Sequence, residues 1–201
     1  MAKYYLHIPS VPLFVPDSLD RLMIRLVLRY RRKHYGFAFR KIKLSQGKYA
    51  IVDPEDYEKL IGYVWYAANA LCTFYAQRNE NGKSVKMHRQ IMNPPAGLFV
   101  DHINHEGLDN RKANLQIATP AENTYNKRKE RGPVSSKYKG VSFRKRLNKW
   151  TAYISYRGRR INLGCFDDEI DAAKAYDKAA KIYHGKFASL NFPDESQIQN
   201  R

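Results

Sequence analysis

The chain has 201 residues, in which 36 Lys and Arg outnumber 19 Asp and Glu, so its formal net charge is +17 and its pI is about 9.9. With 43% hydrophobic and 13% aromatic residues it can bury a core, which excludes a disordered polybasic tail. The charge indicates a polyanionic partner, nucleic acid or an anionic membrane, and argues against an enzyme for small neutral metabolites. Cys72 and Cys165 lie far apart, so we expect neither a disulfide framework nor a structural zinc site. We also expect no secretory signal and no membrane span.

The positive charge is unevenly distributed. Residues 137–193 contain 13 basic and five acidic residues, and the first part of this segment, residues 137–166, contains nine basic residues and no acidic one. Residues 88–126 contain three basic and four acidic residues, an almost neutral stretch inside a basic chain. A metal-dependent site needs acidic and amide ligands, whereas a DNA-docking surface needs Lys and Arg. The distribution therefore predicts a metal-dependent site in residues 88–126 and a DNA-docking surface in residues 137–193.

The first third of the chain predicts helices and short strands. Apolar residues at helical spacing predict a basic amphipathic helix over residues 17–33. Alternating residues around Gln46-Gly47 predict a hairpin over residues 40–53, and Pro54 then opens a short helix to about Ile61. Further strands are predicted at 63–67, 71–78 and 84–91.

Residues 97–131 follow a different pattern. An apolar strand ends in Asp101-His102, a polar loop follows, and a second short strand covers Leu115–Ala118. Thr119-Pro120-Ala121-Glu122 is a capping box with proline in the first helical turn, so a helix begins there. The basic, Gly- and Pro-containing stretch that follows predicts an interdomain linker over 131–136.

Residues 137–193 predict a self-contained unit of three antiparallel strands and one helix. The helix is expected over 168–184, capped by Asp167 and ended by Gly185. Its alanines allow close packing on one face of the sheet, which leaves the other face polar, basic and uncovered. We expect that face to bind DNA through Lys139, Ser142, Arg144, Arg146, Tyr153, Ser155, Arg157, Arg160 and Asn162.

Two segments resemble known families. Val100–Asn126 (VDHINHEGLDNRKANLQIATPAENTYN) resembles the HNH endonucleases, the ββα-metal nucleases of phage and homing endonucleases. Tyr138–Pro193, with YKGVSF and INLGCFDDEIDAAKAYDKAA, resembles the plant ethylene-response-factor (apetala-type, AP2/ERF-like) DNA-binding domain. Ser142 and Asn162 stand where plant members carry Arg or Trp, so the docking mode is expected to carry over without the sequence preference.

The first resemblance implies a set of site residues. His102 would be the general base, and Asp101 and Asn123 would hold one divalent cation, Mg²⁺ or Mn²⁺. Asn114 would hold the loop and orient His102. Arg89, on the preceding predicted strand, could clamp a phosphate or serve a structural role.

The sequence thus predicts an α+β chain in which a ββα-metal nuclease core precedes a three-stranded antiparallel sheet packed on one helix. The expected domains are a basic helical arm (1–39), a nuclease domain with a strand-rich leader (40–130, motif core 88–130), the linker, a DNA-binding domain (137–193) and a tail (194–201).

The expected function is that of a metal-dependent endonuclease of phage or bacterial homing type, acting on double-stranded DNA. We expect it to be cytoplasmic and nucleoid-associated, with no membrane or small-molecule partner and with a monomer favoured. A transcription regulator with an inactive HNH fold is the alternative, and membrane-surface binding by residues 17–33 is a weaker one.

Overall fold

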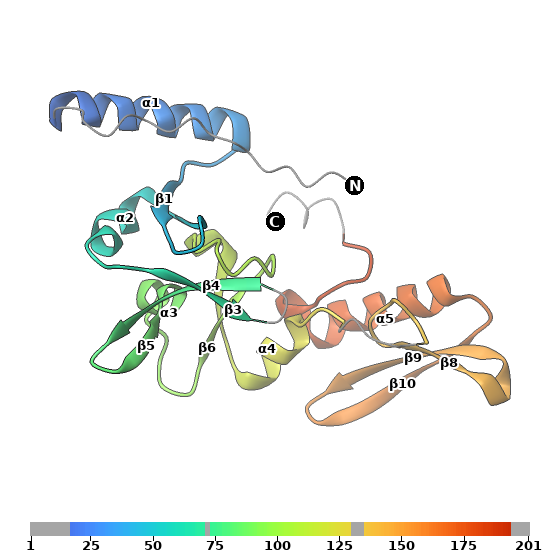
Figure 1. Cartoon of the computed structure of the whole chain (residues 1–201). Helices are drawn as coiled ribbons and strands as arrows, with labels where there is room; N and C mark the ends of the chain where they lie inside the picture. Colours follow the sequence, from blue (N-terminus) through green and yellow to red (C-terminus); the bar gives the residue numbers. More distant parts are fainter. Residues whose placement is uncertain (1–16, 71–72, 130–134, 194–201) are drawn as a thin grey trace. The chain divides into compact units, whose positions relative to one another are not determined.

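The structure is a computed structural model that describes residues 17–70, 73–129 and 135–193. Cys72, most of the predicted linker and the predicted tail lie outside these residues. The chain divides into two compact units, Met1–Arg40 and Lys41–Arg201. Its helices and small antiparallel sheets confirm the α+β class (Figure 1). No helix in the described part of the chain is long and apolar enough to cross a membrane.

The first unit is dominated by the helix α1 (Asp17–Tyr35), which confirms the predicted helix and extends it by two residues. Arg31 is buried in this unit, where its Nη1 donates a hydrogen bond to the carbonyl oxygen of Phe39. Its guanidinium also lies over the Phe39 ring, 4.4 Å from the centroid. These contacts fix the end of the helix against the segment that follows it.

The second unit begins with the predicted hairpin, formed by β1 (Arg40–Lys43) and β2 (Tyr49–Val52), and the short helix α2 (Pro54–Ile61). A three-stranded antiparallel sheet follows, made of β3 (Tyr66–Ala70), β4 (Thr73–Glu80) and β5 (Lys83–Lys86). These elements share one apolar core, which is formed by Ile42, Leu44, Ala50, Val52, Leu60, Trp65, Ala67, Ala76 and Met87.

The predicted strand over 84–91 is wrong in its second half. The strand β5 ends at Lys86, and Met87–Met92 form the helix α3. Met87 and His88 are consecutive and both buried, which a strand with one solvent face does not allow. The helix turns both side chains inward, and Asn93 ends it in the left-handed conformation.

The ββα element has the predicted order: β6 (Phe99–His102), β7 (Leu115–Ala118) and the helix α4 (Pro120–Asn126). The strands are antiparallel, with Asp101 opposite Gln116 and His102 opposite Leu115. The capping box is formed as predicted, because the Thr119 side chain accepts from the Glu122 amide and the Glu122 carboxylate accepts from the Thr119 amide.

The C-terminal part is a three-stranded antiparallel sheet of β8 (Val141–Arg144), β9 (Lys149–Tyr156) and β10 (Arg159–Phe166), with the helix α5 (Glu169–Tyr183) across one face (Figure 1). Ala172, Ala173 and Ala180 are buried between helix and sheet, as the alanine pattern predicted. The predicted cap is one residue off, since Asp168 and not Asp167 accepts from the amides of Ile170 and Asp171.

Candidate functional site

Asp101 lies at the end of β6 among amide groups. Its Oδ2 accepts hydrogen bonds from Gln116 Nε2 at 3.0 Å and from Asn126 Nδ2 at 2.8 Å. Burial raises the pKa of Asp101 above its ordinary value, while these two hydrogen bonds oppose the rise. The carboxylate is therefore held by neutral donors rather than by a cation of the protein, an arrangement that suits a hard metal ion.

His102 points to the other side of the same strand and is 4% exposed. Burial lowers its pKa to about 4, although Asn110 and the charge of Asp109 oppose the shift. Its Nε2 is buried without a hydrogen-bond partner among the described residues, and so are both polar atoms of the Asn110 amide. The Asn110 side chain thus raises the pKa of His102 without forming a hydrogen bond of ordinary geometry to it. The imidazole is therefore neutral at physiological pH.

Two aromatic rings that the sequence analysis did not assign to the site enclose His102. The ring of His88, on α3, packs edge-to-face against it with centroids 4.9 Å apart, and Tyr75, on β4, lies 5.6 Å away. Burial, with the charge of the neighbouring His102, lowers the pKa of His88 to about 3. No local sequence signal marks either residue, because their contacts with His102 join separate segments.

The loop between β6 and β7 is fixed by internal hydrogen bonds. Asn114 Oδ1 accepts from the Asn104 amide at 3.0 Å, and its Nδ2 donates to the Asp109 carbonyl at 2.8 Å. Asp109 also forms a buried ion pair with Arg111. On its outer side the loop is bonded to β2, where Asn110 N donates to the Ile51 carbonyl at 2.7 Å. Asn114 thus joins Asn104 to Asp109 within the loop, while the amide that raises the pKa of His102 belongs to Asn110.

The two asparagines of α4 occupy different environments. Asn126 is buried and its Nδ2 donates to both Asp101 Oδ2 and the His102 carbonyl. Asn123, the expected metal ligand, lies one turn earlier and is partly exposed. Within the described ranges no three His, Cys, Asp or Glu side chains gather to hold a metal. The expected ligand set contains only one carboxylate and one amide, so water and phosphate would supply the other ligands.

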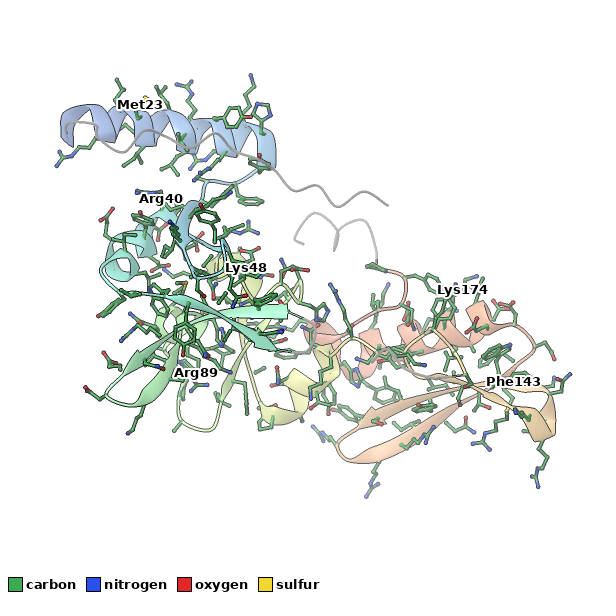
Figure 2. All side chains as sticks on the ribbon, viewed as in Figure 1. Met23, Arg40, Lys48, Arg89, Phe143 and Lys174 are labelled. Atoms are coloured by element: carbon green, nitrogen blue, oxygen red, sulfur yellow. The ribbon has the colours of Figure 1, made fainter. Side chains whose placement is uncertain are left out.

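The region around α3 adds basic residues. Arg89, which Figure 2 labels, is exposed, but its Nη1 donates to the Leu98 carbonyl at 2.9 Å and so supports the turn before β6. Lys86 is exposed, and its charge lowers the pKa of His88 and of His102. The Lys86 ammonium also lies over the Tyr75 ring, 5.4 Å from its centroid, so a positive charge stands near the site that the sequence analysis did not foresee.

The uncovered face of the C-terminal sheet is basic. Arg160 pairs with Ser155, and Asn162 with Tyr153, across β9 and β10. The guanidinium of Arg160 lies 3.4 Å from the centroid of the Tyr153 ring. The alternation of side chains places on this face, or on its rim, Ser142, Arg144, Arg146, Tyr153, Ser155, Arg157, Arg160 and Asn162. All the arginines of this set are exposed.

Lys139 occupies a different place from the one expected. It lies in the turn before β8, and its Nζ donates to the carbonyls of Tyr125 and Lys127, each at 2.6 Å. Burial lowers its pKa to about 8. An ammonium committed to two carbonyls at a helix end does not face solvent as a phosphate contact would, so we leave Lys139 out of the DNA surface.

The same helix end makes further contacts with the C-terminal part. The Tyr125 ring stacks on His184 with centroids 4.0 Å apart and planes 5° apart. Its hydroxyl accepts a hydrogen bond from the Arg157 amide at 3.2 Å. The helix that carries Asn123 and Asn126 is therefore packed directly against the sheet-and-helix part.

Comparison with known proteins identifies both segments. Residues 93–125 match the family model of the HNH endonucleases, and residues 136–186 match that of the AP2 domain. The chain joins an HNH endonuclease domain to an AP2 domain. The two matches together support a nuclease with a DNA-binding domain, and HNH nucleases generally use a divalent metal.

Relatives support the same division. An uncharacterized HNH endonuclease of Acanthamoeba polyphaga mimivirus is 29% identical over 73% of this chain and 76% of its own length. The AP2 part is similar to an AP2-like ethylene-responsive transcription factor of Arabidopsis thaliana, with 43% identity over 33% of this chain and 14% of the plant protein. An AP2/ERF and B3 domain-containing protein of rice is 49% identical over 29% of this chain and 16% of its own length. The plant matches therefore concern the AP2 domain alone. No solved structure matches the chain.

Proposed function

We propose that the protein is an endonuclease that hydrolyses phosphodiester bonds of double-stranded DNA, with His102 as general base and one divalent cation, Mg²⁺ or Mn²⁺. The observation that supports this most is the neutral, enclosed imidazole of His102 beside an amide-bound carboxylate at one strand end. A base must be unprotonated to act, and this imidazole is unprotonated throughout the physiological range.

Each residue has one task in this proposal. Asp101 and Asn123 would hold the cation, which when bound neutralises charge on the scissile phosphate and the leaving oxygen. Since Nε2 of His102 is enclosed, we assign proton uptake from the attacking water to its other ring nitrogen, Nδ1. Asn110 raises the pKa of the ring against the effect of burial, and Asn126 keeps Asp101 next to the His102 backbone.

The AP2 domain would hold the nuclease on its substrate through the basic face of the sheet. A β-sheet face can enter the major groove, where arginines read guanine edges or contact phosphates. We assign these contacts to Arg144, Arg146, Arg157 and Arg160, with Ser142, Tyr153, Ser155 and Asn162 as adaptable hydrogen-bonding groups. A homing role in a phage or bacterial host, with the protein on the cytoplasmic nucleoid, remains part of the proposal, as does a monomeric state.

The test is a nicking assay on supercoiled plasmid with Mg²⁺ or Mn²⁺. We expect His102→Ala to lower the nicking rate at least 100-fold and to leave DNA affinity unchanged. His105→Asn is a matched control in the same loop, because asparagine tolerates the left-handed backbone of this residue (φ 64). Binding without cleavage under either metal would favour the inactive regulator, and unchanged nicking by His102→Ala would reject the assigned base.

A further inference from the structure

A stripe of four arginines runs along α1, outside both matched domains. Arg21, Arg25, Arg29 and Arg32 are spaced by four, four and three residues, so their side chains lie on one face of the helix. All four are exposed, and residues 21–35 contain no Asp or Glu. At 1.5 Å of rise per residue the stripe is roughly 16 Å long. Figure 2 shows side chains projecting from α1 along its length.

The four arginines of the stripe are exposed, whereas Arg31, on the same helix, is buried and supports the fold of this unit. Arg31 is buried, bonded to the Phe39 carbonyl and stacked on the Phe39 ring. Its burial and the nearby charge of Arg40 lower its pKa. Arg31 therefore anchors the end of the helix, and the four exposed arginines are not needed for that task.

The arrangement carries a cost that a polyanion would relieve. Like charges at i, i+4 repel each other and destabilise a helix, and the stripe contains two such pairs and one at i, i+3. One DNA strand carries a phosphate for roughly each 3.4 Å of helix axis, so the stripe covers the axial rise of about five phosphates. Its length and sign therefore fit the backbone of a DNA duplex.

We propose that α1 is a second DNA-binding element, which contacts the phosphate backbone through Arg21, Arg25, Arg29 and Arg32. The inference rests on the DNA substrate of the proposed function. While the AP2 domain holds the chain on DNA, the stripe meets phosphates at high effective concentration, so even weak contacts add to the affinity. Phosphate contacts carry no base information, so α1 strengthens binding to all sequences alike.

Two other partners have to be separated from DNA. Leu22, Leu26 and Tyr30 form an exposed apolar stripe beside the arginines, with exposed fractions of 54%, 53% and 53%. A second copy of the chain paired through this stripe would bring two arginine stripes together, and their repulsion argues against such a dimer. An anionic membrane would take the apolar and basic stripes together.

The experiment compares two variants of the full chain. In the first, all four arginines are replaced by glutamine, which keeps a good helix former at each position; in the control, Leu22, Leu26 and Tyr30 are replaced by glutamine. Circular dichroism verifies that helix content is kept. Affinity for a random-sequence DNA duplex is measured by fluorescence anisotropy from 50 to 300 mM salt.

We expect the arginine variant to bind at least tenfold more weakly at 150 mM salt and to flatten the slope of log K against log salt by about 3–4, near 0.9 for each lost phosphate contact. The apolar control should keep the parent slope. An unchanged slope in the arginine variant overturns the proposal. Two other results also overturn it. One is a parent chain that sediments as a dimer and becomes a monomer only in the apolar control. The other is retention of the parent chain on phosphatidylserine vesicles in the presence of excess duplex.

The outcome does not depend on the nuclease assignment. A flattened slope in a chain that shows no metal-dependent nicking would keep α1 as a DNA-binding element and reject only the proposed hydrolysis. An unchanged slope in a chain that does nick DNA would reject α1 alone.

Discussion

Replacing Gly140 with alanine should destabilise the AP2 domain far more than replacing Gly158, although both glycines have the same backbone conformation. Their φ values are +73° and +75°. A left-handed backbone costs an L-residue about 1–2 kcal/mol, and this cost applies equally to both positions.

The two positions differ in the space around the new methyl group. At Gly140 it would lie 2.0 Å from Tyr176 Cδ2 and 2.6 Å from the Tyr153 carbonyl oxygen, whereas at Gly158 nothing lies within 4 Å. Tyr176 is buried, and the Gly140 carbonyl accepts from the Tyr153 amide at 2.8 Å, so neither neighbour can move freely. Overpacking of this kind costs about 1–3 kcal/mol, for a total of roughly 2–5 kcal/mol at Gly140 against about 1–2 kcal/mol at Gly158.

Urea denaturation followed by tryptophan fluorescence measures both changes. The chain has two tryptophans, so in a Trp65→Phe background only Trp150 reports, and it lies in the AP2 domain. Equal losses in the two alanine variants would refute the steric argument and leave only the backbone cost.

Three further changes test other parts of the structure. Asn126→Ala removes a hydrogen bond to Asp101 and another to the His102 carbonyl, so we expect a higher Mg²⁺ requirement in the nicking assay; an unchanged metal titration would contradict this. The folded-state pKa of His88, about 3, lies below its ordinary value. The unfolded chain therefore takes up a proton between pH 6.5 and 3 that the folded chain does not, so the free energy of unfolding decreases as the pH is lowered over this range. His88→Leu should reduce that slope by up to about 1.4 kcal/mol per pH unit in urea titrations, and an unaltered slope would argue against a buried neutral ring. Tyr125→Ala removes the stacked ring and a hydrogen bond, so the nuclease and AP2 domains should unfold in separate steps in calorimetry, with about 1–3 kcal/mol of coupling lost; a single unchanged transition would speak against it.

The local parts of the fold could be predicted because their signals are local. The capping box at Thr119 and the alternation along β8–β10 are properties of a few consecutive residues, and the structure forms both as predicted. The helix α3 could not be predicted, since it has only six residues and the apolar residues Val85, Met87 and Ile91 stand at even spacings that fit a strand.

In the candidate site, too, only the positions set by local sequence patterns could be predicted. The positions of Asp101 and His102 at one strand end follow from the ββα order. The rings of Tyr75 and His88 reach His102 only through tertiary packing. Lys139 was placed on the DNA-facing side because of its charge, but it lies in the turn before β8, where strand alternation does not decide the direction of a side chain.

The bonds from Lys139 to the end of α4 have a consequence for exchanging the two domains. The last carbonyls of the nuclease helix are capped by a side chain of the AP2 domain, and an aromatic ring of that helix lies flat on an AP2 histidine. A chimera cut within the linker would leave these carbonyls and this ring without their partners. Exchange of recognition domains in this architecture therefore has to carry Lys139 and His184 with the incoming domain, or move the junction to a point before Thr119.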